Sequence, residues 1–391
     1  YTKDDIDEFS RGLTQGFDTE GKYFKVMSDI EEITTPIVGG FRGDLNGNNH
    51  TITLNLEGEG NLALFTWLGD DASIHDLTVD GYVHSTNGCA AGFVAAGYGI
   101  QFKENVSITD CINRASIATD SDYAGGFVGN GWYIIHSNIV NCVNRGNISA
   151  SGDLVGGILG NSLGFEVRGC INRGNVMGGS ICGGIAGKMQ DASIINCANY
   201  GQVTCSDKGG GIVGEKGGGY VGNCYNRGAL SFGTNSGGIS GYNWNLSHIE
   251  NCYNAGAMTA SNTTNCGALS GFNRIETYTT AHCHNNYYLE GTYSVAYGTE
   301  SDMSGTHSYT SFTQAGNLTD WTLAEPILNT TDLLTVLNLF ASENDGYVQW
   351  YDDIYGNNNY FPTFDQGMPP GLAIIPNPIV MAPRPIGAWM Q

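Results

Sequence analysis

Two aspartates occupy the same position in successive copies of a repeated sequence phrase. Glycosidases commonly use a pair of carboxylates for catalysis. Asp122 and Asp153 each stand eleven residues after a cysteine of that phrase. If successive phrases stack, the two side chains lie one strand spacing apart, about 4.8 Å, which is close to the separation that a retaining glycosidase uses. The alternative is a pair of solvated turn carboxylates. No base or cation stands beside them in the sequence, so we expect no catalytic residues and keep this pair as the candidate for an enzyme.

Two further sets of side chains are suited to binding rather than to catalysis. In four phrases an arginine follows a repeated asparagine, which makes an interrupted basic stripe that could hold an anionic glycan or a neighbouring subunit, or pair locally with carboxylates. Aromatic residues recur in the loops after the glycine pairs, where exposed rings could stack on sugars or simply cover the corners of the fold. The candidate contact residues are Arg114, Arg145, Arg173, Arg227, Trp132, Tyr133, Phe165, Tyr220 and Trp244.

The phrase that carries these residues repeats about every 27 residues, and this period predicts the architecture. Aligned on cysteine, successive phrases are spaced by 31, 28, 27, 27, 28 and 31 residues. Each unit contains three short apolar or alternating runs and no helical period. A unit of this size cannot bury its apolar face alone. We therefore predict an all-β solenoid, a single-stranded parallel β-helix with one repeat per coil.

Stacked coils turn each repeated residue type into a column. The cysteines face the core, because side chains alternate along a strand and their polar neighbours, such as Asn141 and Asn196, are expected to point out. The residue two places after each cysteine is asparagine, which tolerates a left-handed turn and can hydrogen-bond from coil to coil. Glycine pairs then turn the chain where side chains would collide. The predicted ladders are Cys111, Cys142, Cys170, Cys197, Cys224, Cys252 and Cys283, with Asn113, Asn144, Asn172, Asn199, Asn226, Asn254 and Asn285.

The eleven cysteines are expected to be free, buried thiols. Cysteines stacked on parallel strands have parallel Cβ vectors, which suit the disulfide torsion of about 90° badly, and a free cysteine packs as a small apolar residue. No CxxC motif occurs, and alternation sends His282 and His284 opposite to Cys283. We therefore expect no metal site and no cofactor.

The composition favours an extracellular protein. The 391 residues include 16 Lys plus Arg against 38 Asp plus Glu, which makes nucleic acid or an anionic membrane a poor partner. No stretch approaches the roughly 18 apolar residues of a membrane span. The chain opens at Tyr1 without a basic and apolar leader, and we interpret it as a mature, secreted chain of the extracellular space or the cell surface.

The repeats resemble the GLUG-type repeats of bacterial and archaeal surface proteins. The resemblance rests on the phrase CxNxGxV followed by GGIVG and on FRGDLNGNNHTITL at residues 41–54, and it covers roughly residues 1–365. It implies a right-handed parallel β-helix in a cell-surface or secreted protein, often beside adhesive modules. It implies no single activity, and fold-level analogy supplies no chemistry.

We divide the chain into an N-terminal cap with a short helix (1–36), the β-helix repeats (37–300), a C-terminal cap region (301–366) and an extended Pro-rich tail (367–391). The tail holds six of the nine prolines, which exclude a helix. Docked on a neighbouring copy, the tail would generate a head-to-tail filament; docking on its own β-helix is the alternative. The candidate apolar anchors are Ile374, Ile375, Ile379, Val380, Ile386 and Trp389.

The sequence thus predicts a non-enzymatic structural or adhesive protein of the cell surface or extracellular space. Its expected partners are copies of itself, in an oligomer or filament, and surface glycans. The alternative is a carbohydrate-binding or carbohydrate-active β-helix, such as a polysaccharide lyase or hydrolase.

Overall fold

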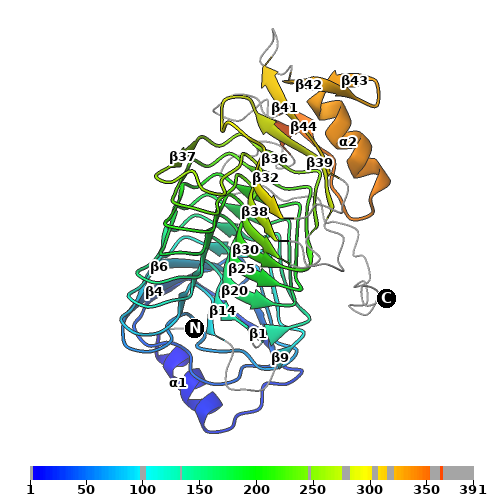
Figure 1. Ribbon diagram of the computed structural model, residues 1–391. Coiled ribbons are helices and arrows are strands. Elements are labelled where there is room, and N and C mark those ends of the chain that lie inside the picture. Colours follow the sequence, from blue (N-terminus) through cyan, green and yellow to red (C-terminus); the bar gives the residue numbers. More distant parts are fainter. Residues whose placement is uncertain are drawn as a thin grey trace.

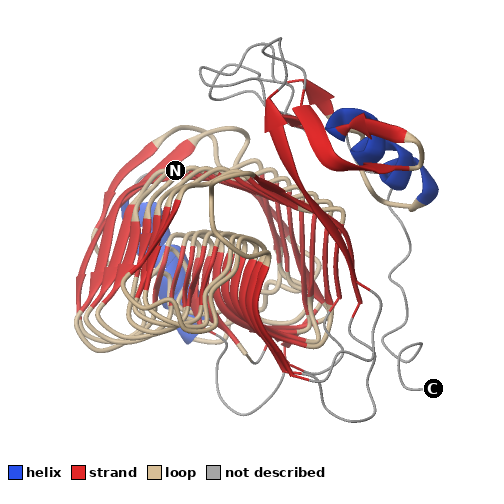
Figure 2. Cartoon of the chain, turned by 45° about the horizontal axis from the view of Figure 1, so that its top comes forward, coloured by secondary structure: helices blue, strands red, loops and turns tan. Residues whose placement is uncertain are grey.

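The chain winds into a rod of stacked coils. The computed structural model describes residues 3–96, 103–132, 134–244, 248–274, 282–301, 307–314, 321–352 and 362–363. These residues form a right-handed parallel β-helix of about eight turns, which confirms the predicted fold class. Figure 1 shows helix α1 (Lys3–Thr14) at one end of the rod and helix α2 (Leu333–Glu343) beside the other end. In Figure 2 the strands form the walls of the coils and the loops form their corners.

The central coils repeat the same five strands. One complete coil consists of β20 (Leu159–Leu163), β21 (Phe165–Arg168), β22 (Ile171–Asn172), β23 (Val176–Met177) and β24 (Cys182–Gly183). Each of these pairs in parallel with its counterpart among β25 to β29 of the next coil. The in-register pairing turns every position of the repeat into a column along the rod.

The strands belong to three large sheets and two small ones. The eight-stranded sheet contains β20 with β8 (Val94–Ala96), β14 (Val128–Gly131), β25 (Ala186–Gln190), β30 (Val213–Gly217), β34 (Ser240–Trp244), β38 (Ser270–Arg274) and β40 (Tyr297–Ser301). The five-stranded sheet contains β24 with β7 (Ala90–Ala91), β13 (Ala124–Gly125), β19 (Val155–Gly156) and β29 (Gly209–Gly210). The two small sheets pair β9 (Lys103–Glu104) with β15 (Ile134–Ile135), and β44 (Tyr351–Asp352) with β45 (Pro362–Thr363).

The third large sheet has 28 strands and includes β21, β22 and β23. Its other members are β1 (Tyr23–Lys25), β2 (Ile30–Ile33), β3 (Asp44–Asn46), β4 (Thr51–Gly58), β5 (Ser73–His75), β6 (Thr78–Ser85), β10 (Ser107–Thr109), β11 (Ile112–Asn113), β12 (Ser116–Thr119), β16 (Ser137–Val140), β17 (Val143–Asn144), β18 (Ile148–Ala150), β26 (Ser193–Ile195), β27 (Ala198–Asn199), β28 (Val203–Cys205), β31 (Tyr220–Gly222), β32 (Tyr225–Asn226), β33 (Leu230–Phe232), β35 (His248–Glu250), β36 (Tyr253–Asn254), β37 (Met258–Ala260), β39 (His282–Leu289), β41 (His307–Gln314), β42 (Trp321–Ile327) and β43 (Thr330–Asp332).

A ladder of asparagine carboxamides runs through the buried interior of the rod. Nδ2 of Asn113 donates to Oδ1 of Asn144 over 2.7 Å, and the same bond, at 2.7 or 2.8 Å, joins each following member of the column up to Asn254. Each carboxamide lies over the second glycine of a pair. A Cβ on Gly157 would lie 2.3 Å from Cγ of Asn172, so only glycine leaves room for the ladder there.

The left-handed conformation falls on a different asparagine from the one predicted. Asn196 (φ 55), Asn223 (φ 53) and Asn251 (φ 51), each directly before a cysteine, adopt it. These side chains lie on the outer face of the coils, as the alternation predicts, and form a second ladder in which Nδ2 of Asn223 donates to Asn196 and Nδ2 of Asn251 donates to Asn223. All three are nevertheless fully buried, because C-terminal residues cover them and accept hydrogen bonds from their Nδ2 groups.

The cysteine column is buried, and its thiols are free. Burial raises the pKa of the Cys142 and Cys224 thiols well above its ordinary value, because a thiolate there would lose its hydration. Sγ of Cys197 donates to the carbonyl oxygen of Ile195 at 3.3 Å. These thiols fill the core and are not nucleophiles.

The last members of both predicted ladders lie outside them. Cys283 pairs with Ile249, not with Cys252, and the cysteine position of this coil is taken by Asn286, whose Oδ1 accepts from the Cys252 amide at 3.1 Å. The physical reason is register: 34 residues separate Cys252 from its structural counterpart, three more than the sequence spacing suggested. Asn285 accordingly takes the left-handed position before that site, with φ 51.

The C-terminal residues pack on the outside of the later coils. Tyr225, Tyr253 and Tyr287, which follow the cysteine position on the outer face, form an apolar cluster with α2 and with Trp350. The second asparagine ladder supplies the polar contacts. Asn223 Nδ2 donates to the Val348 carbonyl at 3.0 Å, and Trp350 Nε1 donates to Asn223 Oδ1 at 2.6 Å.

We expect Asn172→Ala to lower the free energy of unfolding by about 2–4 kcal/mol, because it removes two coil-to-coil hydrogen bonds and leaves buried amide atoms unpaired. Asn113→Ala, at the end of the ladder, removes one such bond and is expected to cost about half as much. Urea unfolding followed by circular dichroism measures both values. Equal costs at the two positions would contradict a ladder that strengthens towards its middle.

Candidate functional site

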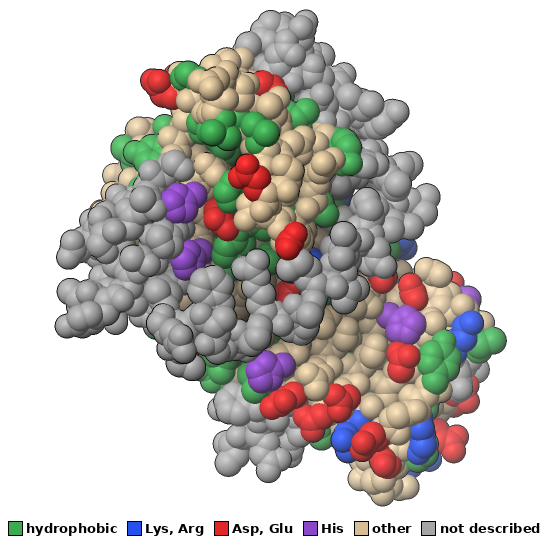
Figure 3. Space-filling view, turned by 90° about the vertical axis from the view of Figure 1, so that its right-hand side faces the viewer, with side chains coloured by type: hydrophobic (Ala, Val, Ile, Leu, Met, Phe, Trp, Pro, Cys, Tyr) green, Lys and Arg blue, Asp and Glu red, His purple; other side chains and the backbone are tan. Residues whose placement is uncertain are grey.

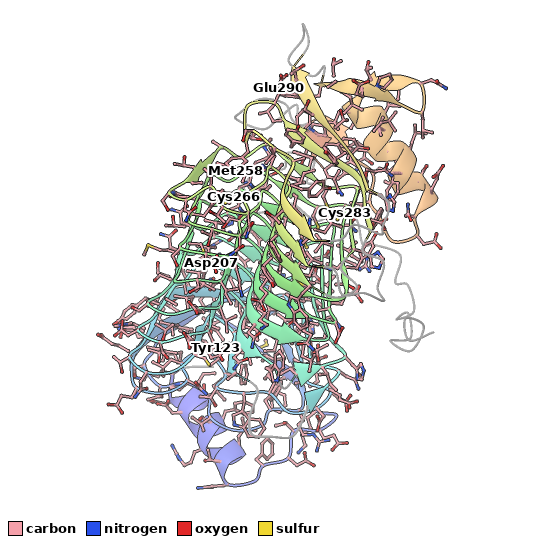
Figure 4. The ribbon with its side chains drawn as sticks, in the orientation of Figure 1. Tyr123, Asp207, Met258, Cys266, Cys283 and Glu290 are labelled. Carbon is pink, nitrogen blue, oxygen red and sulfur yellow. The ribbon has the colours of Figure 1, made fainter. Side chains whose placement is uncertain are left out.

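The two candidate carboxylates lie in one column, at a turn before the five-stranded sheet. Because Ala124 pairs with Val155, Asp122 and Asp153 occupy equivalent positions of adjacent coils. Ser180 takes this position in the next coil, and Asp207 follows in the coil after that. Figure 4 labels Asp207, together with Tyr123, the residue that follows Asp122. The stacking that the sequence suggested is therefore present, over two adjacent coils.

These carboxylates accept hydrogen bonds from the backbone of the next coil. Oδ1 of Asp122 accepts from the amide of Asp153 at 2.8 Å, and Oδ1 of Asp153 accepts from the amide of Ser180 at 2.6 Å. Asp207 repeats the pattern with a side chain, accepting from Nδ2 of Asn235 at 2.7 Å. Each carboxylate thus ties its turn to the equivalent turn of the next coil.

The surroundings of Asp122 offer no reactive partner within the described ranges. Burial first, and then the negative charge of Asp122, raise the pKa of Cys89 to about 12, so this thiol stays protonated. No ion pair joins Asp122 or Asp153 to a cation in the described part of the chain. Across the same residues, no group of three His, Cys, Asp or Glu side chains is placed to hold a metal ion.

The four candidate arginines also form a column, and Tyr200 fills its gap. The amide of Arg145 donates to the Asn113 carbonyl at 2.7 Å, and the equivalent amides of Arg173, Tyr200 and Arg227 bond to the preceding coils at 2.8 Å. Tyr200 lies between two guanidinium groups: Cζ of Arg173 is 4.7 Å from its ring centroid, and Cζ of Arg227 is 5.3 Å away. The sequence position of Tyr200, directly after a ladder asparagine, is the signal that places it in this column.

The stacked arginines repel one another. Burial first, and then the charges of Arg114 and Arg173, lower the pKa of Arg145 from its ordinary value. Arg114 is exposed and Arg145 is half-buried, and the described residues place no carboxylate in ion-pair contact with either. Like charges directly opposite each other destabilise a sheet, so this edge has unsatisfied affinity for anions.

The candidate aromatic residues do not form a continuous exposed row. Phe165 is only 1 % exposed and packs in the core, which corrects its place among the contact residues. Tyr220 faces Tyr347 of the C-terminal region, with ring centroids 6.3 Å apart. The register of the paired strands puts Trp132 and Trp244 in one column but four coils apart. Tyr133 lies outside the described residues.

In-register stacking also covers the faces of neighbouring aromatic rings. Tyr242 and Phe272 stack at 5.1 Å with an interplanar angle of 14°, and Lys208 Nζ lies 4.8 Å from the centroid of Tyr242. A sugar binds an aromatic ring through the ring face. The stacking covers one face of each ring, which argues against this pair as a sugar platform.

Beside these rings, Glu215 is held between two lysines. Its oxygens lie 2.6 Å from Lys208 Nζ and 2.9 Å from Lys188 Nζ. Burial opposes ionisation of this carboxyl, but the two ammonium groups prevail and hold its pKa below the ordinary value. Glu215 is therefore ionised at neutral pH and unsuited to donate a proton.

A lysine that the sequence reasoning did not single out lies in the interior. Lys216 is fully buried between Met189 and Asn243 of the same column, and its Nζ donates to the Gly219 carbonyl at 2.8 Å. Burial lowers its pKa to about 7. With no exposure to solvent, its effect is on stability.

On the face that Figure 3 shows, acidic side chains are scattered among uncharged ones, and the visible Lys and Arg gather mainly at the end that carries α1. None of the helices in the described ranges is long and apolar enough to cross a membrane.

No family model matches the sequence, so the resemblance to GLUG-type repeats has no support of that kind, and no curated protein matches it. A solved structure from Bacteroides ovatus, described as "a putative immunoglobulin A1 protease", shares 19% identity over 72% of this chain and 83% of that one, with a TM-score of 0.48. A likeness this distant carries no argument about activity. The class of protein that the described residues define is a right-handed parallel β-helix.

We expect Asp122→Asn to change the free energy of unfolding by less than about 0.5 kcal/mol, because the amide oxygen still accepts from Asp153, whereas Asp122→Ala should cost about 1 kcal/mol. Urea titration of both variants measures the difference. If Asp122→Asn lowers the free energy of unfolding as much as Asp122→Ala does, the position requires the negative charge and not merely a hydrogen-bond acceptor.

The stability of the chain should rise with pH between about 7 and about 8, below the range in which the thiols of the unfolded chain ionise. The pKa of Lys216 is about 7 in the folded chain and near 10.4 when unfolded, so over this interval the unfolded state binds more protons, with a slope of at most about 1.4 kcal/mol per pH unit. Lys216→Met, which continues the Met189 column, should flatten this rise and stabilise the chain at pH 7. Lys22→Met, at an exposed site, is the control and should leave the slope unchanged.

Proposed function

We propose that this chain is a non-enzymatic structural or adhesive protein of the cell surface or extracellular space, and that it assembles with copies of itself through its C-terminal tail. The observation that carries the proposal is the hydrogen bonding of Asp122 and Asp153. Both carboxylates accept backbone amides of the next coil, so the stacked acidic pair has a structural role that accounts for its recurrence.

Three further features support a role based on surface and shape. The coils are tied together from within by side-chain ladders, which leaves the outer columns free to vary. The formal net charge of −22 suits an exposed, soluble surface. The repeats also resemble GLUG-type repeats of surface proteins, which often accompany adhesive modules.

The competing function is a polysaccharide-active enzyme, and one observation favours it. Asp122 and Asp153 do stand on adjacent coils, at about the spacing that retaining glycosidases use. Incubation of the chain with a panel of acidic and neutral polysaccharides separates the two functions. Release of oligosaccharides that Asp153→Asn abolishes would replace our proposal.

Removal of residues 367–391 is expected to abolish self-assembly and to leave the β-helix folded. The six predicted anchors lie outside the described residues, so the prediction rests on their apolar character. Burial of several such side chains, at about 1.5–3 kcal/mol each, would support association after the costs of ordering. Light scattering measures the oligomer, and circular dichroism measures the fold.

A matched control is the full-length chain with Ile379→Ser and Trp389→Ser, which keeps the length and the prolines but removes two anchors. Its assembly should be weakened in the same direction. A truncated chain that forms the same oligomer would overturn the assembly proposal, and a truncated chain that unfolds would show that the tail completes its own subunit.

A further inference from the structure

The edge that carries Arg114, Arg145 and Arg173 places three cations on consecutive coils. Their backbones are in register, as the amide contacts of Arg145 and Arg173 to the preceding coils show. Successive side chains therefore start about 4.8 Å apart along the rod. This is a linear array of charges, as opposed to a compact pocket for a single anion.

Within the described residues, the first two arginines of this array, Arg114 and Arg145, have no internal counterion. No carboxylate makes an ion pair with Arg114 or Arg145, and Nε of Arg145 is buried without a hydrogen-bond partner. A fold that stacks like charges without neutralising them loses stability. An external anion would offset that loss.

The groups beside the arginines are uncharged amides. Asn147 and Asn175, two residues after Arg145 and Arg173, are both exposed, and each uses its Oδ1 to accept a backbone amide of the next coil. Their Nδ2 groups are amide donors of the kind that bind hydroxyl groups. The edge thus alternates guanidinium groups, which bind carboxylates in a two-pronged manner, with amides suited to hydroxyls.

We propose that this edge binds an acidic polysaccharide, an extended chain of uronic acid residues that lies along the rod with its carboxylates on Arg114, Arg145 and Arg173. A uronate chain carries one carboxylate per sugar ring, and an extended hexose ring advances by a distance comparable with the coil spacing of about 4.8 Å. The inference rests on the proposed adhesive function and names its ligand class. A nucleic acid is disfavoured by the formal net charge of −22.

The test is calorimetric titration of the full chain with hexagalacturonate at low salt. Arg145→Gln and Arg114→Gln should each weaken binding about tenfold or more, because each removes a charge-assisted contact. Arg42→Gln, which changes the net charge equally but affects an arginine that already forms an ion pair with Glu20, should bind as the unaltered chain does. The affinity of Arg145→Lys should lie between those of the unaltered chain and Arg145→Gln, because lysine keeps the positive charge but lacks the two-pronged hydrogen bonding of a guanidinium group.

Three results would overturn the proposal: no binding of hexagalacturonate at millimolar concentration, an equal loss in Arg42→Gln, or equal affinity for the fully methyl-esterified hexamer. Equally tight binding of hexaglutamate would show that the edge takes acidic peptide and would overturn the ligand class. Mass spectrometry of the recovered hexamer separates this inference from the proposed function. A hexamer that is bound and cleaved would refute the non-enzymatic function while leaving the binding edge in place.

Discussion

A carboxamide donates and accepts at the same time, and this property lets one asparagine per coil tie the rod together. Nδ2 of Asn144 bonds Asn172, and Nδ2 of Asn172 bonds Asn199, without any change of geometry. Such a chain of bonds requires each coil to repeat at the strand spacing and in the same register. It also requires a glycine beneath each carboxamide, because a Cβ at Gly184 would lie 2.3 Å from Cγ of Asn199. Two residue types of the repeat thus follow from one interaction.

Strict register has a consequence for every other side chain, because it places like groups over like. Stacked thiols are harmless in the core, where burial keeps them protonated. Stacked rings such as Tyr242 and Phe272 consume each other's faces and lose the surface that a sugar would use. A guanidinium group differs from a ring, because its hydrogen-bond donors lie on its edge. On a rod of this kind, arginine columns keep their binding groups accessible while aromatic columns do not.

The period of the cysteines was enough to predict the fold class and the position of most columns, because spacing alone sets which residues stack. It failed where packing of a distant segment decides burial. Asn196 and Asn223 lie on the outer face, as the alternation predicts, yet both are fully buried because residues 346–348 cover them, and no local pattern in the repeat predicts this cover. Cys283 shows the other limit, since a change in loop length moved the register and no local pattern marks the shift. The candidate site was predictable as columns, but the hydrogen bonds that engage Asp122 depend on turn geometry that spacing does not encode.

The second ladder explains why the two halves of the rod differ on the outside. In the later coils, Asn196 and Asn223 offer carboxamide groups to the backbone of residues 346–348, and Tyr225 and Tyr253 provide the apolar contacts beside them. In the earlier coils, the positions equivalent to Tyr225 are held by Ile112 and Val143, both half-buried, and Gly169 interrupts the asparagine series. The described C-terminal residues bond to Arg168 and to the coils that follow it, whereas Arg114 and Arg145 lie on coils that precede it. The repeat that builds the rod is uniform, but the side chains along two outer columns change from the earlier to the later coils. This change makes the later coils the contact surface for the chain's own C-terminal region. It leaves the positive charges of Arg114 and Arg145, on the earlier coils, unneutralised by any ion pair among the described residues.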